Sequence, residues 1–212
     1  MHWNHEATTP LHEERLEAVM EAVRASGARR LLDLGCGEGD LLVRIAQEPG
    51  LEQILGIDLD ARRLEQLRLR LEAIAAEPPR TCGGERQGHK GHRIELRHGS
   101  LTEPDASLAG FDCALLIETI EHIEPRDLTQ VEQAIFARMR PRSVIITTPN
   151  AEYNPLLEVP PNRFRHPDHR FEWDRPRFQR WARGVAQRHG YGLRHRDIGG
   201  VHAVYGGASQ MA

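Results

Sequence analysis

The chain has 212 residues, which is enough for one domain to bury roughly 70% of the surface that its unfolded form exposes. Its hydrophobic content of 39% and charged content of 28% are typical of a soluble globular protein, and no apolar stretch approaches the roughly 20 residues that a membrane-spanning helix needs. The net charge of −3 argues against a protein that binds nucleic acid through its overall field, and three cysteines without metal-motif spacing argue against a disulfide framework or a zinc knuckle.

Short apolar strands alternate with amphipathic helices along the chain. This alternation predicts an α/β fold with a mostly parallel sheet and right-handed crossovers, as one domain over 1–212. Residues 1–6 lack the basic and apolar regions of a secretory signal, so we expect a cytoplasmic protein. Residues 77–93 combine prolines, glycines and charges without periodicity, which predicts a mobile loop. In chain order, the predicted elements are a lead-in helix over 11–27 with Gly27 as its stop, strand 30–34, helix 41–46, strand 53–57, helix 61–76, strands 94–97 and 111–117, helix 127–139, strand 143–148, helix 175–189, strand 191–197 and, at 209–212, the start of a last strand.

A glycine-rich turn, Asp33-Leu34-Gly35-Cys36-Gly37-Glu38-Gly39, joins the first strand to the next helix. Glycine lets the backbone approach a ligand, and the amino end of the following helix is electropositive. Asp58, at the end of the second strand, is placed to accept both hydroxyls of a ribose. These features resemble the Rossmann-like fold of methyltransferases that use S-adenosylmethionine (AdoMet), and an NAD-type domain is the alternative. The resemblance implies cofactor contacts from Asp33, Gly35, Gly37, Asp58, Ser100 and Leu101.

An acidic run that ends in histidine, Glu118-Thr119-Ile120-Glu121-His122, follows the fourth predicted strand directly. Its spacing would place two carboxylates and one imidazole on the same face of a helical turn. Ligands of parallel α/β sheets bind at the carboxyl ends of strands, which is where this run begins. Joined by His169 from a distant loop, with His166 as the competing ligand, the set mixes oxygen and nitrogen donors and favours Mg²⁺, Mn²⁺, Fe²⁺ or Co²⁺. The alternative is a chance grouping on a solvated turn.

A divalent metal at this place suits a substrate with two adjacent hydroxyls. A cation chelated by both oxygens would lower the pKa of one hydroxyl and hold it in line with the methyl group of the cofactor. The hydroxyl oxygen would then attack the methyl carbon, while an imidazole, a carboxylate or water takes the proton. Glu118, His122 and His169 are therefore the candidate catalytic residues.

The segment from Arg163 to Arg183 is locally basic, with seven arginines against three acidic residues and five aromatic side chains among them. The planar guanidinium of arginine suits phosphate, and aromatic rings suit stacked bases, as in proteins that bind single-stranded nucleic acid. An ordinary solvated helix face in an arginine-rich chain is an equal alternative. Asn150 and Asn154 join these arginines as weaker candidates for contacts to a terminal nucleotide.

Several motifs in a fixed order carry a family resemblance. They are Leu11–Leu16, Asp33–Gly37, Gly99–Leu101, Glu118–His122, Thr148–Asn154 and Asp168–Trp173. Together they resemble the HEN family of RNA 3′-terminal 2′-O-methyltransferases, from about residue 11 to the end. The resemblance implies AdoMet and a divalent metal, Mn²⁺ or Mg²⁺, as cofactors, and an RNA 3′ end as the substrate. It implies that the metal is held by Glu118, Glu121, His122 and His169.

The same resemblance bears on partners. Bacterial members look like partners of an RNA-repair kinase and phosphatase enzyme, whereas eukaryotic members act on small silencing RNAs. Three other functions are compatible with the same residues. One is a metal-dependent O-methyltransferase for a small catechol-like diol, the second is a non-catalytic module that binds RNA ends, and the third is an AdoMet enzyme whose glutamates and histidines hold no metal.

Overall fold

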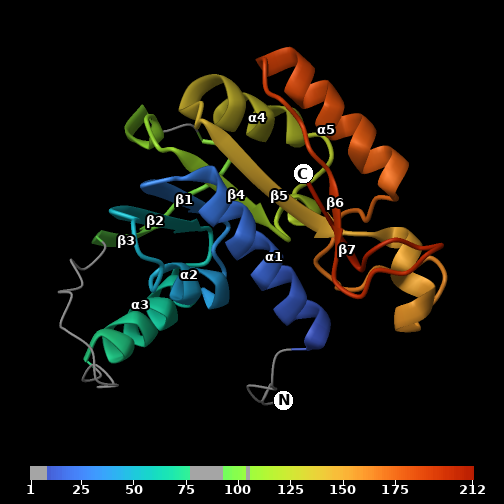
Figure 1. Ribbon diagram of the computed structural model, residues 1–212, viewed down its shortest axis with the longest axis horizontal. Coiled ribbons are helices and arrows are strands. Elements are labelled where there is room, and N and C mark those ends of the chain that lie inside the picture. The colour runs from blue at the N-terminus through green and yellow to red at the C-terminus, as the bar shows by residue number, and fades with distance from the viewer. Residues whose placement is uncertain (1–8, 77–92, 104–105) are drawn as a thin grey trace.

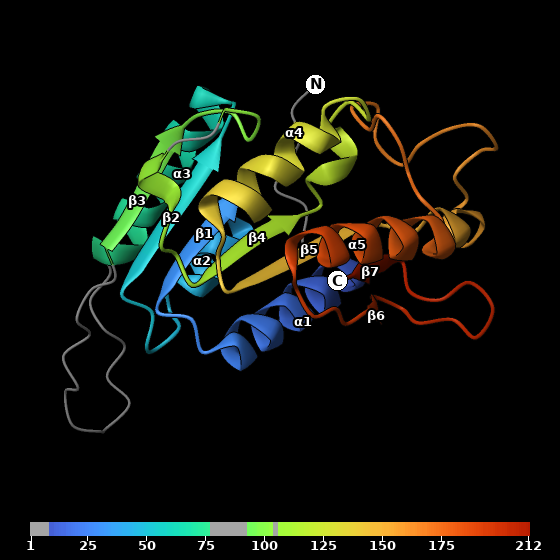
Figure 2. The same cartoon turned by 90° about the horizontal axis from the view of Figure 1, so that it is seen from above.

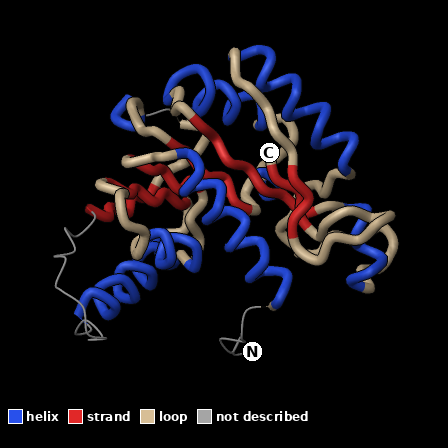
Figure 3. Tube along the Cα trace, in the orientation of Figure 1, coloured by secondary structure: helices blue, strands red, loops and turns tan. Residues whose placement is uncertain are grey.

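The computed structural model describes residues 9–76, 93–103 and 106–212, so the loop predicted over 77–93 lies outside the described residues apart from Arg93. Helices and strands alternate along the described chain (Figure 3), and none of the helices there is long and apolar enough to span a membrane. The strands are β1 (Arg30–Leu34), β2 (Gln53–Asp58), β3 (Arg93–His98), β4 (Cys113–Ile117), β5 (Ser143–Pro149), β6 (Arg196–Ile198) and β7 (Ser209–Met211). The helices are α1 (Pro10–Ser26), α2 (Asp40–Ile45), α3 (Ala61–Ala76), α4 (Leu128–Glu132) and α5 (Arg175–His189), with the shorter or tighter turns η1 (Ala106–Leu108), η2 (Ile120–His122) and η4 (Ala151–Leu157) and the π-helix η3 (Gln133–Met139).

In the described part of the chain, the strands form one sheet in the order β3-β2-β1-β4-β5-β7-β6 (Figure 1). The strands β1 to β5 are parallel, whereas β7 is antiparallel to both β5 and β6. From β1 the chain builds β2 and β3 on one side, and later β4 and β5 on the other, so the strand order reverses between β1 and β4. In sheets of this kind, ligands bind beyond the carboxyl ends of the strands at such a reversal.

Capping residues set the ends of α1 and α5. The Thr9 hydroxyl accepts a hydrogen bond from the His12 amide at 3.3 Å, and Gly27 ends α1 with φ +61°. The Asp174 carboxylate accepts one from the Arg177 amide at 2.8 Å, and Gly190 ends α5 with φ +75°. A helix end with positive φ favours glycine, which has no Cβ to clash. The stop predicted at Gly27 is therefore confirmed.

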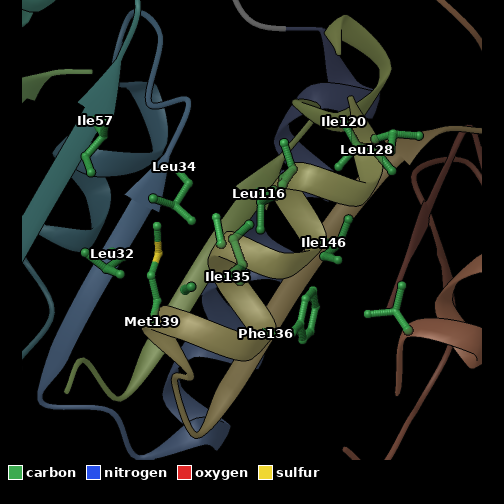
Figure 4. Close-up of a cluster of buried hydrophobic side chains, with 14 of the residues drawn as sticks. Leu32, Leu34, Ile57, Leu116, Ile120, Leu128, Ile135, Phe136, Met139 and Ile146 are labelled. Carbon is green, nitrogen blue, oxygen red and sulfur yellow. The ribbon is translucent and has the colours of Figure 1, made fainter. Parts of the chain in front are cut away.

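Two helical layers bury the sheet between them, with α4 and α5 on one side of the strands and α1, α2 and α3 on the other (Figure 1). On one face α1, α2 and α3 cover Leu31, Ile54 and Leu115. On the other face, α4, η3 and α5 cover a second apolar cluster, in which Leu116 of β4 lies beside Ile135 of η3 (Figure 4). Successive side chains of a strand point to opposite faces, so strands between two layers must be apolar throughout. This packing fixes the strand ends on which the site is built.

Some predicted elements differ from the structure. The helix expected over 127–139 is α-helical only as far as Glu132 and continues from Gln133 as the π-helix η3. Both α4 and η3 still bury apolar side chains, as the predicted apolar face requires. The strand expected over 191–197 is limited to β6, because β6 pairs with β7 only over Arg196–Ile198. The strand start expected at 209–212 is confirmed as β7. The loop expected after β5 contains η4, which Asn150 caps by accepting a hydrogen bond from the Glu152 amide at 3.0 Å.

Candidate active site

A cavity of about 1250 Å³ opens at the carboxyl ends of β1, β2 and β4. One part, the glycine half, is lined by all the residues predicted to bind the cofactor, namely Asp33, Gly35, Gly37, Asp58, Ser100 and Leu101. The other part, the acid–histidine half, consists of Glu118, Glu121, His122, His166 and His169. Glu121 is the member of that half that does not line the cavity, because its side chain is fully buried behind the wall.

The turn after β1 is held by backbone geometry. Gly35 has φ +86°, and a Cβ added there would lie 2.7 Å from the side chain of Thr119 on the turn after β4. Gly37 has φ +55°, and its amide donates a hydrogen bond to the Asp58 carboxylate at 2.8 Å. Residues with a side chain rarely adopt these conformations. Gly35 therefore lets the loops after β1 and β4 meet, and the hydrogen bond from Gly37 to Asp58 fixes the turn to the end of β2.

Asp33 lies beneath this turn with 3% of its surface exposed. Burial, with the nearby charge of Asp58, raises the pKa of the Asp33 carboxyl to about 7. On the far side of the glycine half, the hydroxyls of Ser100 and Thr102 share a hydrogen bond of 2.7 Å. The glycine half thus combines open backbone with one carboxylate at its rim, Asp58, and one buried carboxyl, Asp33.

The helical turn predicted for the Glu118–His122 run is wrong in its extent. Glu118 has φ +50° and lies outside the 3₁₀ turn, which begins only at Ile120. Because of this left-handed residue, Glu118 lines the cavity whereas Glu121 points into the protein. The two glutamates therefore do not share one helix face, although Glu118 remains close enough for its charge to act on Glu121.

Both glutamates have one oxygen in use and one without a partner. Glu118 Oε2 accepts hydrogen bonds from Arg15 at 3.2 Å and from Ser209 at 3.4 Å, and Glu121 Oε2 accepts one from Thr148 at 3.0 Å. The Oε1 atoms of both are buried, and no hydrogen-bond partner for either lies among the described residues. Burial, reinforced by the charge of Glu118, raises the pKa of Glu121 well above its ordinary value. A buried carboxylate such as Glu121 is costly unless a cation compensates its charge.

Three imidazoles line the same cavity as Glu118. The ring centroids of His122 and His169 are 4.8 Å apart, and His166 lies 5.8 Å from the first and 5.6 Å from the second. Their potential ligand atoms all lie within 4.8 Å of one another, a close group that, among the described residues, does not include either glutamate. Desolvation by the surrounding atoms, with the charges of the other two histidines, lowers the pKa of His122. A neutral ring can bind a metal or accept a proton.

His169 is oriented by Glu172, a residue to which the sequence assigned no role. The Nδ1–H of His169 donates to Glu172 at 2.6 Å, which leaves Nε2 free to face the cavity. Glu172 also accepts hydrogen bonds from the Asn154 side chain and the Arg165 amide, each at 2.7 Å. Although burial alone would raise it, these hydrogen bonds lower the pKa of Glu172. The spacing of three residues between His169 and Glu172 was the available signal.

Arg15 of α1 is a second residue that sequence reasoning did not single out. Besides its ion pair with Glu118, its Nη1 donates to the Ser209 hydroxyl at 3.3 Å, and its Nη2 lies 2.8 Å from His12 Nδ1. It therefore ties α1 and β7 to the turn after β4. The Leu11–Leu16 motif contains Arg15, but only the fold shows that it reaches a residue 103 positions away.

Comparisons with known proteins agree with this geometry. Residues 4–198 match a family model for a methyltransferase domain. The chain is 34% identical over 195 residues to a small RNA 2′-O-methyltransferase of Gallus gallus, a match that covers 91% of this chain and 49% of that protein. It thus spans about half the length of the curated vertebrate relatives that it matches.

Solved structures of methyltransferases also match this chain. The methyltransferase domain of bacterial CtHen1 matches with a TM-score of 0.80 at 35% identity, covering 95% of this chain and 97% of that one. The small RNA methyltransferase HEN1 matches with a TM-score of 0.83 at 30% identity, covering 100% of this chain and 26% of that one.

Proposed function

The chain belongs to the HEN1 family of methyltransferase domains, and from this premise we propose that it transfers a methyl group from AdoMet to the 2′-hydroxyl of the 3′-terminal ribose of RNA, with the help of a divalent metal. The observation that carries the proposal is the acid–histidine half. The half-buried Glu118 and the buried Glu121 each have a buried Oε1 atom with no hydrogen-bond partner among the described residues, and Glu118 lines the same cavity as three clustered imidazoles and the glycine turn. A site for a diol and a site for the methyl donor would then share one cavity.

The donor set fits a hard or borderline divalent cation. Carboxylate oxygens without a hydrogen-bond partner among the described residues, together with imidazoles, are the ligands that Mn²⁺ or Mg²⁺ would find here. Glu118, Glu121, His122 and His169 would hold the ion, and Glu172 would fix the ring of His169. His166 belongs to the same close group of histidines, so it is the residue that most directly competes with the proposed set. When bound, such an ion supplies a lower pKa for a coordinated hydroxyl and compensates the buried negative charge.

The glycine half fits AdoMet. Gly35 and Gly37 have positive φ and line the cavity, so they give the turn a backbone path that residues with a side chain rarely adopt, and Asp58 offers a carboxylate to a ribose diol. Ser100 and Leu101 would lie against the adenine, with Asp33 below the methionine part. AdoMet carries a methyl group on a positively charged sulfur, which makes that carbon open to attack by an oxygen.

The residues around the cavity would then position the reaction. The 2′-oxygen of the RNA forms the new bond to the methyl carbon, the bond from sulfur to that carbon breaks, and the hydroxyl proton leaves to an imidazole, a carboxylate or water. Glu118, His122 and His169 line the cavity and are the residues proposed to act there. Arg15 would hold Glu118 in place while the substrate binds.

RNA repair or protection of small RNA ends is the proposed context. The family resemblance of the motifs predicts an RNA-repair kinase and phosphatase enzyme as a partner. A cytoplasmic location stays a prediction from the sequence of residues 1–6. The whole activity of a longer relative is not implied, since the match covers about half of each such protein.

The test is methyl transfer from labelled AdoMet to RNA that ends in a 2′,3′-diol. We expect labelling with Mn²⁺ or Mg²⁺, none after chelation of the metal, and none on the same RNA with a 2′-deoxy end. Digestion to nucleosides should place the label on the terminal 2′-oxygen. Equal labelling of the deoxy-ended RNA, or a rate unaffected by chelator, would refute the proposal. Methylation of catechol without methylation of RNA would favour the small-diol rival.

A further inference from the structure

Helix α5 has an unusual charge composition. It contains five arginines and no acidic residue in Arg175–His189. The arginines near its two ends are paired: Arg175 contacts Glu152 at 2.7 Å, and Arg188 contacts the buried Glu132 at 2.8 Å. These two ion pairs attach the helix to η4 and α4. They leave the middle of α5 with positive charge only.

The three arginines between them form what we call the α5 row: Arg177, Arg180 and Arg183. All three are exposed, and no carboxylate partner for any of them lies within ion-pair distance among the described residues. Their spacing of three residues places them about 4.5 Å apart along the helix axis, within about 120° of its circumference. Some other exposed arginines do have such partners, for example Arg24 with Glu48 and Arg196 with Glu21, whereas Arg138 and Arg140 also lack one among the described residues.

The row begins at the amino end of α5, just after the loop that carries His169. The guanidinium of Arg177 lies 5.3 Å from the centre of the Trp173 ring, and Trp173 stacks on Phe171 at 4.3 Å. Phe171 is two residues after His169. Trp173 also bridges to Asn150 at the end of β5, so the amino end of α5 lies near the carboxyl edge of the sheet (Figure 2). From there the row leads away from the cavity along the helix.

We propose that the α5 row binds the phosphates of the RNA nucleotides that precede the 3′ end. This rests on the proposed function, which places the terminal ribose in the cavity and requires the rest of the strand to leave it. A strand presents one phosphate per nucleotide, and each arginine offers a planar fork that matches phosphate oxygens. Because the net charge of the whole protein is −3, its overall field does not attract RNA. Binding of the strand would therefore depend on a local group of positive charges such as the α5 row.

The test compares RNA binding by two charge-matched variants of the whole chain. The first is Arg177→Gln/Arg180→Gln/Arg183→Gln. The second, the control, is Arg24→Gln/Arg29→Gln/Arg196→Gln, which removes three exposed arginines that are ion-paired to glutamates away from the cavity. Fluorescence anisotropy would give the affinity for diol-ended single strands of about 4 and about 16 nucleotides across a range of salt concentrations. Circular dichroism and thermal unfolding would check that each variant is folded.

For the longer RNA at 0.1 M salt, the α5 variant should bind about 10- to 100-fold more weakly than wild type, and the slope of log affinity against log salt should fall by about 2. The control variant should bind it like wild type. Equal affinities for the wild type and the α5 variant would overturn the proposal, and so would equal losses in both variants. Loss of binding to an acidic peptide with RNA binding intact would instead identify a protein partner. Failure of the proposed function has a different signature, because wild type would then methylate neither RNA.

Discussion

The two halves of the cavity are built in different ways. The glycine half is mostly backbone: turns with positive φ at Gly35 and Gly37, fixed by strand ends that the core holds in place. The acid–histidine half is made of side chains, and its contacts join α1, the turn after β4, the loop before α5, and β7. A backbone site survives changes in neighbouring side chains, whereas a side-chain site depends on each of its contacts. Substitutions in the two halves should therefore fail in different ways.

Removing a carboxylate from the acid–histidine half should have the largest effect. Glu118→Ala is expected to lower kcat/KM for methyl transfer to RNA by about 1000-fold, or about 4 kcal/mol, because an anionic ligand of the proposed metal is lost. AdoMet affinity, measured by calorimetry, should stay unchanged because the glycine half is intact. Glu21→Ala, which breaks an exposed ion pair with Arg196, is the matched control and should keep full activity. If Glu118→Ala methylated RNA at the wild-type rate, with that rate still abolished by a chelator, the metal would not need Glu118 and this role would be contradicted.

The buried acid of the glycine half should make stability depend on pH. The pKa of Asp33 in the fold is about 7, above its ordinary value near 4, so the folded protein binds a proton more tightly than the unfolded chain. Stability is then greatest below about pH 4 as far as this group is concerned, and up to about 4 kcal/mol is lost as pH rises to about 7.

Asp33→Asn should remove that loss. Urea unfolding of the protein without AdoMet or metal, at a series of pH values, would show a flatter profile for the variant than for wild type. A profile of the same steepness in both proteins would mean that Asp33 ionises normally.

A Cβ in the glycine turn should separate backbone strain from contact with the ligand. Gly35→Ala combines a positive φ with a contact of 2.7 Å to Thr119, and should lower the free energy of unfolding by about 2 to 3 kcal/mol while weakening AdoMet binding. Gly27→Ala has a positive φ but no atom within 4 Å, so it should cost about 1 kcal/mol and leave AdoMet binding alone. Thermal unfolding and calorimetry would measure both. Equal losses in the two variants would show that Thr119 does not matter.

The smallest expected effect concerns the support of His169. Glu172→Gln keeps the shape but loses the charge that orients the ring, and should weaken Mn²⁺ binding by about 10- to 100-fold. Electron paramagnetic resonance of free Mn²⁺ during a titration would measure the affinity without any turnover. Glu152→Gln, which disturbs a carboxylate paired with Arg175 at 2.7 Å, serves as the control. The same Mn²⁺ affinity in Glu172→Gln and wild type would show that the ring needs no such support.

The glycine half could be predicted from sequence because its signals are local. Strand ends, the glycines between them and Asp58 follow one another in the order in which they meet in space, and the strands β1 and β2 appear almost where the apolar pattern put them. All the residues expected to bind the cofactor line one cavity. Chain order was enough there because parallel strands deliver their carboxyl ends to the same edge.

The acid–histidine half could be predicted only in part. The sequence named its glutamates and histidines, but its spacing argument assumed a helical turn, and the left-handed Glu118 breaks that assumption. Nothing in a linear pattern indicates that Arg15 reaches Glu118 across 103 positions, and only the spacing of three residues points to the contact between Glu172 and His169. Such contacts arise from the packing of loops and helices against one another, and no periodic sequence pattern predicts that packing.

Whether the glutamates or the three histidines hold the metal is decided most directly by anomalous diffraction from crystals grown with Mn²⁺. We predict a single peak bounded by the free Oε1 atoms of Glu118 and Glu121 and by His122 and His169, with Nδ1 of His169 still bonded to Glu172. A peak held by His122, His166 and His169 without either glutamate, or no peak in the cavity, would contradict the proposed site.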